Sequence, residues 1–392
     1  MKFQVAKSDL ETAISTVGGA MNAADGDISS HLLFRMKPGT VDQVEMLAAS
    51  NRIYANCVIQ KAVVTDAGSS FTIEGWRLKG WIGMVGDVPL DFETTTDAEV
   101  IVKGGKYTQR FRSLDPSHFH FMDKTLAGAE FKGRIKAKRL SHALRIAKSF
   151  ASTDDTTKPD VVVVDIQDGQ LVATDKSSVV VFFTLNDLPK CTMRVHIKDV
   201  SGMASFLDQV DGDVEVLDAT RVVFIRRLSD NAVYGETRYM VNFPKLTPPA
   251  TVDQRTWSVK ASELRRAAQH GHFGARKDDK RLFVHPPDSE GRIKVSMKTD
   301  TNVGVFTPVY IECTEVKNDP KASDIPSDGF PVSYQHVLAI LDAFPNDDNL
   351  DLGVNFDPVK NRMYIRVAKK VFVDDKDGSC DTYLFVLAGM VW

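Results

Sequence analysis

The apolar and polar positions of this chain repeat in three stretches of similar design. Residues 3–10, 133–140 and 257–264 each have the pattern of a short strand that runs into an amphipathic helix. Their apolar positions fall in register at Val5, Ile135 and Val259, then at Leu10, Leu140 and Leu264, then at Ala13, Ala143 and Ala267. A long internal period of this kind predicts several copies of one supersecondary unit.

A second register lies inside each unit. Residues 71–82, 195–206 and 330–341 repeat the strand-to-helix pattern. An apolar residue stands nine positions before a large apolar residue in the pairs Ile73 and Ile82, Ile197 and Phe206, and Val332 and Leu341. Each unit is therefore predicted to hold two half-units, each a strand, a helix and further strands. The alternative is chance similarity between generic amphipathic segments, which six matches in consistent order disfavour.

The strand signals between the helices are those of hairpins. Residues 161–173 read as two strands closed at Asp168-Gly169, and residues 99–112 as two strands closed at Gly104-Gly105. Near the end of the chain, residues 364–367 and 383–387 flank a turn at 374–378. The fold class expected is α+β with antiparallel sheets. Proline and small polar residues at 124–130 and 247–254 suggest three domains, at residues 1–128, 129–250 and 251–392.

Composition places the chain among ordinary globular proteins. Its 392 residues, 43% of them hydrophobic, are enough for two or three domains with their own cores. The four cysteines lack metal-ligand spacing and read as reduced thiols. No apolar run is long enough to span a bilayer, and the N-terminus has no leader pattern. We therefore expect a cytoplasmic protein without a membrane partner.

Basic charge is concentrated on one predicted helix. Residues 132–148 hold seven basic side chains and no acidic one, namely Lys132, Arg134, Lys136, Lys138, Arg139, Arg145 and Lys148. A helix starting near Lys138 would bury Leu140, Ala143, Leu144, Ala147 and Phe150 and project Lys138, Arg145 and Lys148 from its other side. A solvated helix face is one interpretation. Because such a face usually mixes both signs of charge, the absence of acids favours a surface that meets a polyanion.

The sequence offers no catalytic constellation. It lacks glycine-rich nucleotide loops and a Gly-x-Ser-x-Gly turn. The pairs His118/His120 and His270/His272 have no third ligand nearby, and residues 374–378 resemble a calcium loop with Val373 where a ligand is needed. We therefore expect a binding protein without a cofactor or a metal, and not an enzyme.

Several local motifs resemble the bacterial DNA polymerase sliding clamp, the beta subunit. They are Val-Ala-Thr-Asp at 172–175, Phe243-Pro244, the segment 330–341, Leu-Asp-Pro-Ser-His-Phe at 114–119, and Tyr-Leu-Phe-Val-Leu-Ala at 383–388. The resemblance implies three clamp domains per chain and a head-to-tail homodimeric ring, with sheets outside and helices around a hole for double-stranded DNA. It also implies that a replicative DNA polymerase and a clamp loader are partners. A non-catalytic interaction scaffold that does not encircle DNA is the alternative.

The resemblance assigns residues to three surfaces. The DNA-facing candidates are Arg77, Lys79, Lys136, Lys138, Arg145, Lys148, Lys198, Arg265 and Arg266. The candidates for a cleft that binds partner peptides are Thr174, Val179, Pro244, Tyr334, Leu387 and Met390. For Val179 and Leu387, ordinary strand core is the alternative. Hairpin 99–112 would form the dimer contact, with Phe111 and Phe273 as its apolar centre.

The chain also departs from the family pattern. Lys176-Ser177-Ser178 replaces the family's Gly-His-Arg, Ala388 replaces a proline, and Lys277 stands where a large aromatic is usual. Four residues follow Ala388. The cleft is therefore expected to be present in altered form, as in a divergent or phage-encoded clamp. The first helix, at residues 8–21, carries little basic charge, so its share of any DNA contact is expected to be small.

Overall fold

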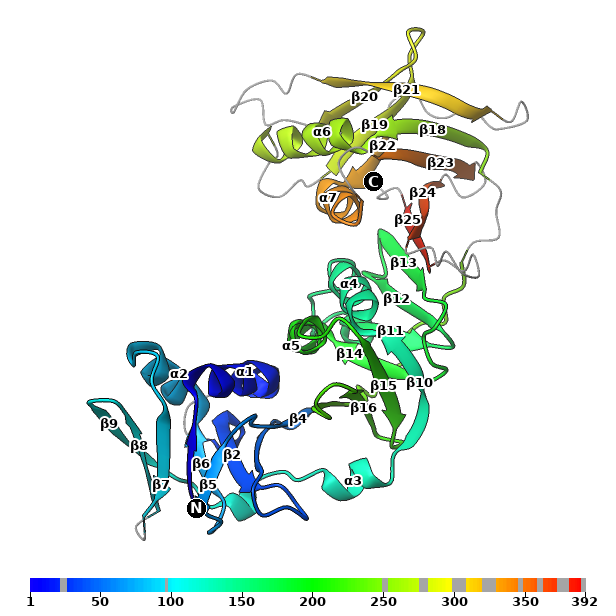
Figure 1. Cartoon of the computed structure of the whole chain (residues 1–392). Coiled ribbons are helices and arrows are strands. Elements are labelled where there is room, and N and C mark those ends of the chain that lie inside the picture. The colour runs from blue at the N-terminus through cyan, green and yellow to red at the C-terminus, as the bar shows by residue number, and fades with distance from the viewer. Residues whose placement is uncertain are drawn as a thin grey trace. The chain divides into compact units, whose positions relative to one another are not determined.

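The fold repeats one strand-helix-strands pattern six times (Figure 1). The structure is a computed structural model that describes residues 1–21, 27–95, 98–248, 253–274, 281–297, 308–318, 329–344, 348–357, 362–371 and 381–388. In each repeat a strand leads directly into an amphipathic helix, and three strands follow. This arrangement confirms the α+β class and the two half-units per repeat.

The elements follow in chain order. The first two half-units are β1 (Lys2–Val5), α1 (Lys7–Val17), β2 (His31–Met36), β3 (Val44–Ala49) and β4 (Ile53–Val58), then β6 (Phe71–Glu74), α2 (Gly75–Met84), β7 (Leu90–Thr94), β8 (Glu99–Gly104) and β9 (Tyr107–Arg112). The next two are β10 (Glu130–Lys136), α4 (Ala137–Lys148), β11 (Val163–Gln167), β12 (Gln170–Thr174) and β13 (Val179–Thr184), then β14 (Met193–His196), α5 (Ile197–Asp208), β15 (Asp213–Asp218), β16 (Val222–Arg227) and β17 (Val233–Thr237). The last two are β18 (Arg255–Lys260), α6 (Ala261–Gly274), β19 (Arg281–Pro287), β20 (Arg292–Met297) and β21 (Val309–Asn318), then β22 (Phe330–Ser333), α7 (Tyr334–Leu341), β23 (Asn349–Asp357), β24 (Arg362–Val371) and β25 (Asp381–Ala388).

Short elements lie between the half-units. They are the 3-10 turn η1 (Gly18–Ala20) after α1, the strand β5 (Val63–Asp66) after β4, and the helix α3 (Asp123–Ala127) before β10. None of the helices in the described ranges is long and apolar enough to cross a membrane.

In the fourth half-unit, the residue that matches Ile73 and Val332 lies two positions before the one predicted from the sequence. Strands β6, β14 and β22 end at Glu74, His196 and Ser333, and the helix starts at the next residue in each case. The residue that matches Ile73 and Val332 is therefore Val195, and not Ile197, which is the first residue of α5. Val195 and Ile197 are both apolar and both buried, so the periodicity alone could not separate the two registers.

The described contacts group the chain into two compact units. Unit 1 holds residues 1–142 and 187–240, and unit 2 holds residues 143–186 and 241–392. The division into domains at residues 128 and 250 stays a prediction. Strand pairing inside each unit crosses one of these expected boundaries, since β4 pairs with β17 in unit 1 and β13 pairs with β25 in unit 2.

Unit 1 contains two antiparallel sheets. One has the order β5-β1-β7-β8-β9, and the other β10-β15-β16-β17-β4-β3-β2-β6. Four phenylalanines join the sheets, because Phe3 and Phe92 belong to the first and Phe34 and Phe71 to the second. The ring centroids are 4.7 Å apart for Phe3 and Phe92 and 4.9 Å apart for Phe34 and Phe71. This stack forms part of the apolar core of the N-terminal part of the chain.

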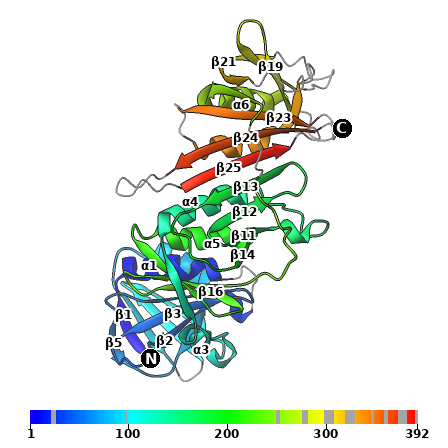
Figure 2. The ribbon, with the colours of Figure 1, turned by 90° about the vertical axis from the view of Figure 1, so that its right-hand side faces the viewer.

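Unit 2 is built on one long antiparallel run of strands. Its order is β11-β12-β13-β25-β24-β23-β18-β21-β20-β19-β22. Figure 2 shows β12, β13, β25 and β24 side by side, although β25 lies about half the chain away from β13 in sequence. Helix α6 packs on β18, β20 and β21, and it contacts α7.

Candidate functional site

Helix α4 has the two faces that its sequence predicts. Leu140, Ala143, Leu144 and Ala147 are buried, and Phe150 just after the helix has no exposed surface. Lys138 and Arg145 are exposed, and Lys148 is half-exposed. The Nζ atom of Lys138 donates a hydrogen bond to the Asp208 carbonyl at 2.7 Å and lies 3.4 Å from a carboxylate oxygen of Asp211. The helix therefore presents a basic face, on which Lys138 is partly neutralised by Asp211, three residues after the end of α5.

The other basic candidates differ in how much charge they leave available. Lys79, Lys136, Lys198 and Arg266 are exposed. The guanidinium of Arg77 lies 2.7 Å from the Glu74 carboxylate. The guanidinium of Arg265 forms a 2.7 Å ion pair with Asp342, which follows α7, and its side chain is only 23% exposed. Arg265 thus joins α6 to α7, a contact that sequence spacing could not reveal.

Helix α1 lacks a basic face, as expected. Its only basic residue, Lys7, donates a hydrogen bond to the Val85 carbonyl and lies 3.8 Å from the Glu11 carboxylate. Its exposed side chains include Ser8, Glu11 and Thr12. This surface would attract a polyanion much less than that of α4.

The structure brings three of the expected cleft residues together in unit 2. Val179 and Leu387 are direct partners on the neighbouring strands β13 and β25. The Thr174 hydroxyl donates a hydrogen bond to the Val179 carbonyl at 2.6 Å. All three side chains are at most 4% exposed, so the strand-core interpretation describes their packing.

The remaining cleft candidates lie on other segments. Tyr334 is the first residue of α7 and is 6% exposed. Pro244 is half-buried. Met390 lies outside the described residues.

An ordered turn stands where the sequence departs from the family pattern. The Asp175 carboxylate accepts hydrogen bonds from the backbone N–H groups of Ser177 at 2.9 Å, Ser178 at 2.8 Å and Val179 at 3.0 Å. Burial alone would raise the pKa of Asp175, but these bonds and one from the Ser178 hydroxyl hold the pKa below its ordinary value. The turn therefore fixes the start of β13 at Val179. An aspartate closely followed by two serines is the sequence signal that could have revealed this turn.

Lys158 ties this turn to the preceding segment. Its Nζ atom donates to the Asp175 carbonyl at 2.9 Å and to the Ser177 hydroxyl at 2.6 Å. Sequence reasoning missed this residue because it lies 17 positions before Asp175. Among the described residues, no group of three or more His, Cys, Asp and Glu side chains is placed to hold a metal ion.

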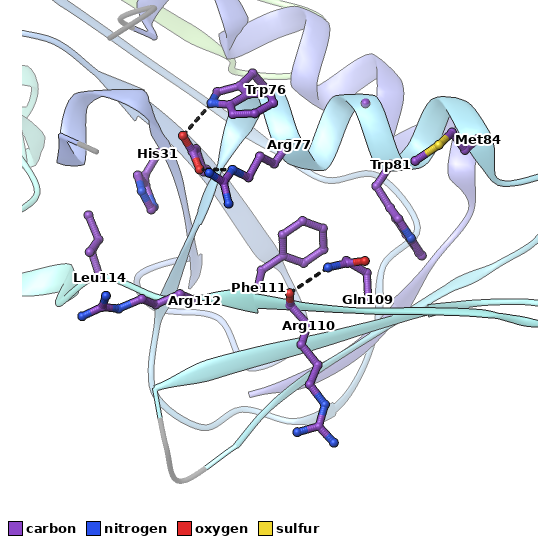
Figure 3. A pocket seen from close by; sticks show the side chains of 12 residues that line it. His31, Trp76, Arg77, Trp81, Met84, Gln109, Arg110, Phe111, Arg112 and Leu114 are labelled. Carbon is purple, nitrogen blue, oxygen red and sulfur yellow. Dashed lines mark hydrogen bonds and ion pairs between the residues drawn. The ribbon is translucent and has the colours of Figure 1, made fainter. Parts of the chain in front are cut away.

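A hollow of about 580 Å³ lies between α2 and β9 in unit 1 (Figure 3). Its lining includes Trp76, Arg77, Gly80, Trp81, Met84 and Phe111. Trp76 and Met84 are 52% and 74% exposed, whereas Phe111 is 7% exposed. The rings of Phe111 and Trp81 meet edge to face, with centroids 6.3 Å apart. Phe111 is therefore a buried wall of the hollow and does not project from the surface.

Strand β9 beside the hollow is the terminal strand of its sheet. The second residue expected at this contact, Phe273, lies in α6, and its side chain is outside the described part of the structure.

Comparisons with known proteins support the fold. No protein-family model matches the chain, and no curated protein matches its sequence. Solved structures match over the full length. The DNA polymerase sliding clamp of Bacillus subtilis is 16% identical, with a TM-score of 0.77 and 100% of both chains covered. The DNA polymerase III beta subunit of Thermotoga maritima is 14% identical, with a TM-score of 0.78 and coverage of 100% of this chain and 99% of that one.

A sliding clamp of Bartonella birtlesii, solved bound to griselimycin, is 15% identical at a TM-score of 0.78 with both chains fully covered. Similarity at this level of identity concerns the fold. It agrees with the six half-units, the antiparallel sheets and the helix that follows each opening strand. The chain therefore has the fold of the bacterial DNA polymerase III beta subunit, the sliding clamp.

Proposed function

We propose that this protein is a DNA sliding clamp, a ring-shaped processivity factor that encircles double-stranded DNA and tethers the replicative polymerase. The observation that carries the proposal is the full-length match of all six half-units to clamps, at TM-scores of 0.76 to 0.78. The basic face of α4 supports it, because lysine and arginine opposite phosphates bind DNA without reading its sequence. The proposed protein is non-catalytic and cytoplasmic, and a clamp loader is its further partner.

A pairing rule inside the chain supports a ring of two copies. The last strand of the first half-unit in one repeat pairs with the last strand of the second half-unit in the next repeat. This is how β4 pairs with β17 and β13 pairs with β25. Residues 309–312 of β21 pair with β20 on one side, and β9 pairs with β8 on one side. By the same rule, each of these strand segments needs a second partner on its other side. A second copy of the chain would supply both.

The helix ends follow a parallel rule. In unit 1 the turn η1 after α1 packs on α5, with Gly19 against Gly202. In unit 2, Phe150 after α4 packs on His336 of α7 at 5.8 Å and on Phe385 of β25 at 5.4 Å between ring centroids. The end of α6, at Phe273 and Gly274, should therefore meet α2 and β9 of a second copy.

The hollow beside Phe111 is the surface that this contact requires. Gly80 lines it and is the sixth residue of α2, as Gly202 is the sixth residue of α5. No atom lies within 4 Å of a Cβ built on Gly80, whereas Gly202 is closely packed. The hollow thus resembles one side of an interface whose other side would come from a second copy. By the same matching, Arg77 corresponds to Asp199 and would lie near this seam.

The test measures the mass of the assembly and its retention on circular and cut DNA. Native mass spectrometry should find a dimer, and the protein loaded by its clamp loader should stay on circular DNA and slide off when the DNA is cut. Loss at equal rates from circular and cut DNA would contradict encirclement and favour a scaffold that binds its partners without a ring.

A further inference from the structure

Glu236 is a buried acid in the seam between β4 and β17, the strand pair that joins the first and fourth half-units, and it has no hydrogen-bond partner among the described residues. Its side chain has no exposed surface. It stands directly opposite Ile53, the first residue of β4. Both of its carboxylate oxygens lack a hydrogen-bond partner among the described residues. A carboxylate in this position would be desolvated without compensation, which is costly.

The charged groups around Glu236 come from several elements. Asp199 of α5 adds a second negative charge, and Arg52, just before β4, is the nearby cation. Arg52 already lies 2.9 Å from an Asp199 carboxylate oxygen. Tyr234 on the same strand is fully buried, and its hydroxyl also lacks a partner among the described residues.

The groups around Glu236 favour the neutral form of its carboxyl group. His196 and Lys198 act on Asp199, and the charged groups that act on Glu236 are Asp199 and Arg52. Burial first, and the charge of Asp199 second, place the pKa of Glu236 well above its ordinary value, with Arg52 opposing them.

The matching position in the other seam is apolar. Leu387 of β25 stands opposite Val179, the first residue of β13, as Glu236 of β17 stands opposite the first residue of β4. Leu387 is also buried, at 3% exposure. The two seams therefore share one geometry, and a leucine fits it at any pH. Glu236 fits it only while its carboxyl group carries a proton.

We propose that the protonation of Glu236 controls the seam between β4 and β17. The two strands stay paired while its carboxyl group is protonated, and they separate when it ionises. Ionisation releases the proton to solvent and leaves a carboxylate that needs water. Water reaches it only if β17 separates from β4 or from α5. This inference goes beyond the clamp function and does not depend on it.

The sign of the pH effect follows from linkage. A carboxyl group whose pKa is raised in the closed state contributes its full stabilisation below the ordinary Glu pKa of about 4.3, and loses it as the pH rises towards the raised pKa. Across that window the opening constant of the seam should rise by up to about tenfold per pH unit.

Hydrogen exchange of the full chain tests whether the pairing of β4 with β17 depends on pH. The opening constants of amides in residues 53–56 and 233–236 are measured against pH and corrected for the intrinsic exchange rate. The wild-type constants should rise with pH, and Glu236→Gln should make them independent of pH. Glu236→Leu, which installs the residue type found in the other seam, should do the same and serves if the glutamine variant folds poorly.

A second carboxylate of the same sheet is the matched control. Glu215 on β15 is buried like Glu236, but Arg134 lies 2.9 Å from its carboxylate and Arg226 also binds it. Glu215→Gln should leave the pH dependence of the β4–β17 amides as in the wild type. An equal rise with pH in the wild type and Glu236→Gln, or no rise in the wild type, would overturn the proposal.

Discussion

Gly19 and Gly202 pack backbone to backbone, so that a Cβ atom built on Gly19 would lie 2.7 Å from the Cα atom of Gly202. Gly19 belongs to η1 and Gly202 to α5, 183 positions further along the chain. A Cβ built on Gly202 would lie 2.9 Å from the Gly19 carbonyl oxygen and 3.2 Å from the Tyr234 hydroxyl. No side chain fits at either position without moving backbone, so this contact sets how closely η1 approaches α5.

Gly202→Ala should therefore destabilise the protein by about 1–3 kcal/mol, the usual cost of overpacking. Chemical denaturation measures it. The matched control is Gly83→Ala, at an exposed position of α2 that does not line the hollow and where space is open. There, the helix propensity of alanine should add up to about 1 kcal/mol of stability. Equal effects at both positions would show that the close approach of Gly19 does not constrain the fold.

The α4 face should carry most of the proposed DNA contact. Arg145→Glu with Lys148→Glu should weaken DNA association and lower the slope of log affinity against log salt by about one for each phosphate that the helix no longer neutralises. Titration of a duplex at several salt concentrations measures both. The control is Lys61→Glu with Lys190→Glu, which makes the same charge change at exposed lysines outside the helices. An unchanged slope in the α4 variant would remove this helix from the DNA surface.

The hollow beside α2 should be covered in the dimer. Met84 lines it and is 74% exposed, so Met84→Glu should leave the chain folded and shift it towards monomer, because it would bury a charge in the seam. Sedimentation at several concentrations reports the change. Val41→Glu, at a residue 82% exposed that does not line the hollow, should leave the dimer intact. A dimer of unchanged strength in the Met84 variant would place the contact elsewhere.

The cleft residues make stability and partner binding hard to separate. Leu387→Ala should cost about 2–5 kcal/mol of folding stability, since the side chain is buried. It should also weaken binding of a polymerase-tail peptide, as Tyr334→Ala should, by about 2 kcal/mol or more if each anchors the peptide.

Peptide titration well below the unfolding temperature of each variant distinguishes the two effects. Leu171→Ala, at a fully buried residue of β12 outside the proposed cleft, is the stability-matched control. It should bind the peptide as the wild type does. Wild-type affinity in both cleft variants would place the partner site elsewhere.

Acid should weaken the turn that Asp175 organises. Its pKa is lowered in the folded protein, so its stabilisation is present above the ordinary Asp pKa of about 3.9 and is lost as the pH falls through the lowered value. Asp175→Asn should therefore be less stable than the wild type at pH 7, and the difference should shrink as the pH falls below about 4. Urea unfolding at both pH values measures it. Asp168→Asn, in an exposed turn with positive φ, should change stability little at either pH.

Local pattern alone determined the repeating elements of this protein. The 3.6-residue period predicted α4 and its buried face, because a helix buries side chains three and four positions apart whatever lies opposite. The hairpin of β11 and β12 was readable from Asp168-Gly169, both with positive φ, since few residues adopt that conformation. The turn of the hairpin at residues 99–112 lies one residue later than predicted, because β8 runs through Gly104 and β9 starts at Tyr107.

The tertiary structure decided which strands meet and what the side chains at the seams experience. The pairing of Val179 with Leu387 joins positions 208 residues apart, and no local period encodes it. The same holds for Arg265, drawn to Asp342, and for Phe111, buried against Trp81. Glu236 reads in the sequence as an ordinary strand glutamate. Its carboxylate oxygens lack a partner among the described residues and its pKa is raised because β4, β17 and α5 bury it.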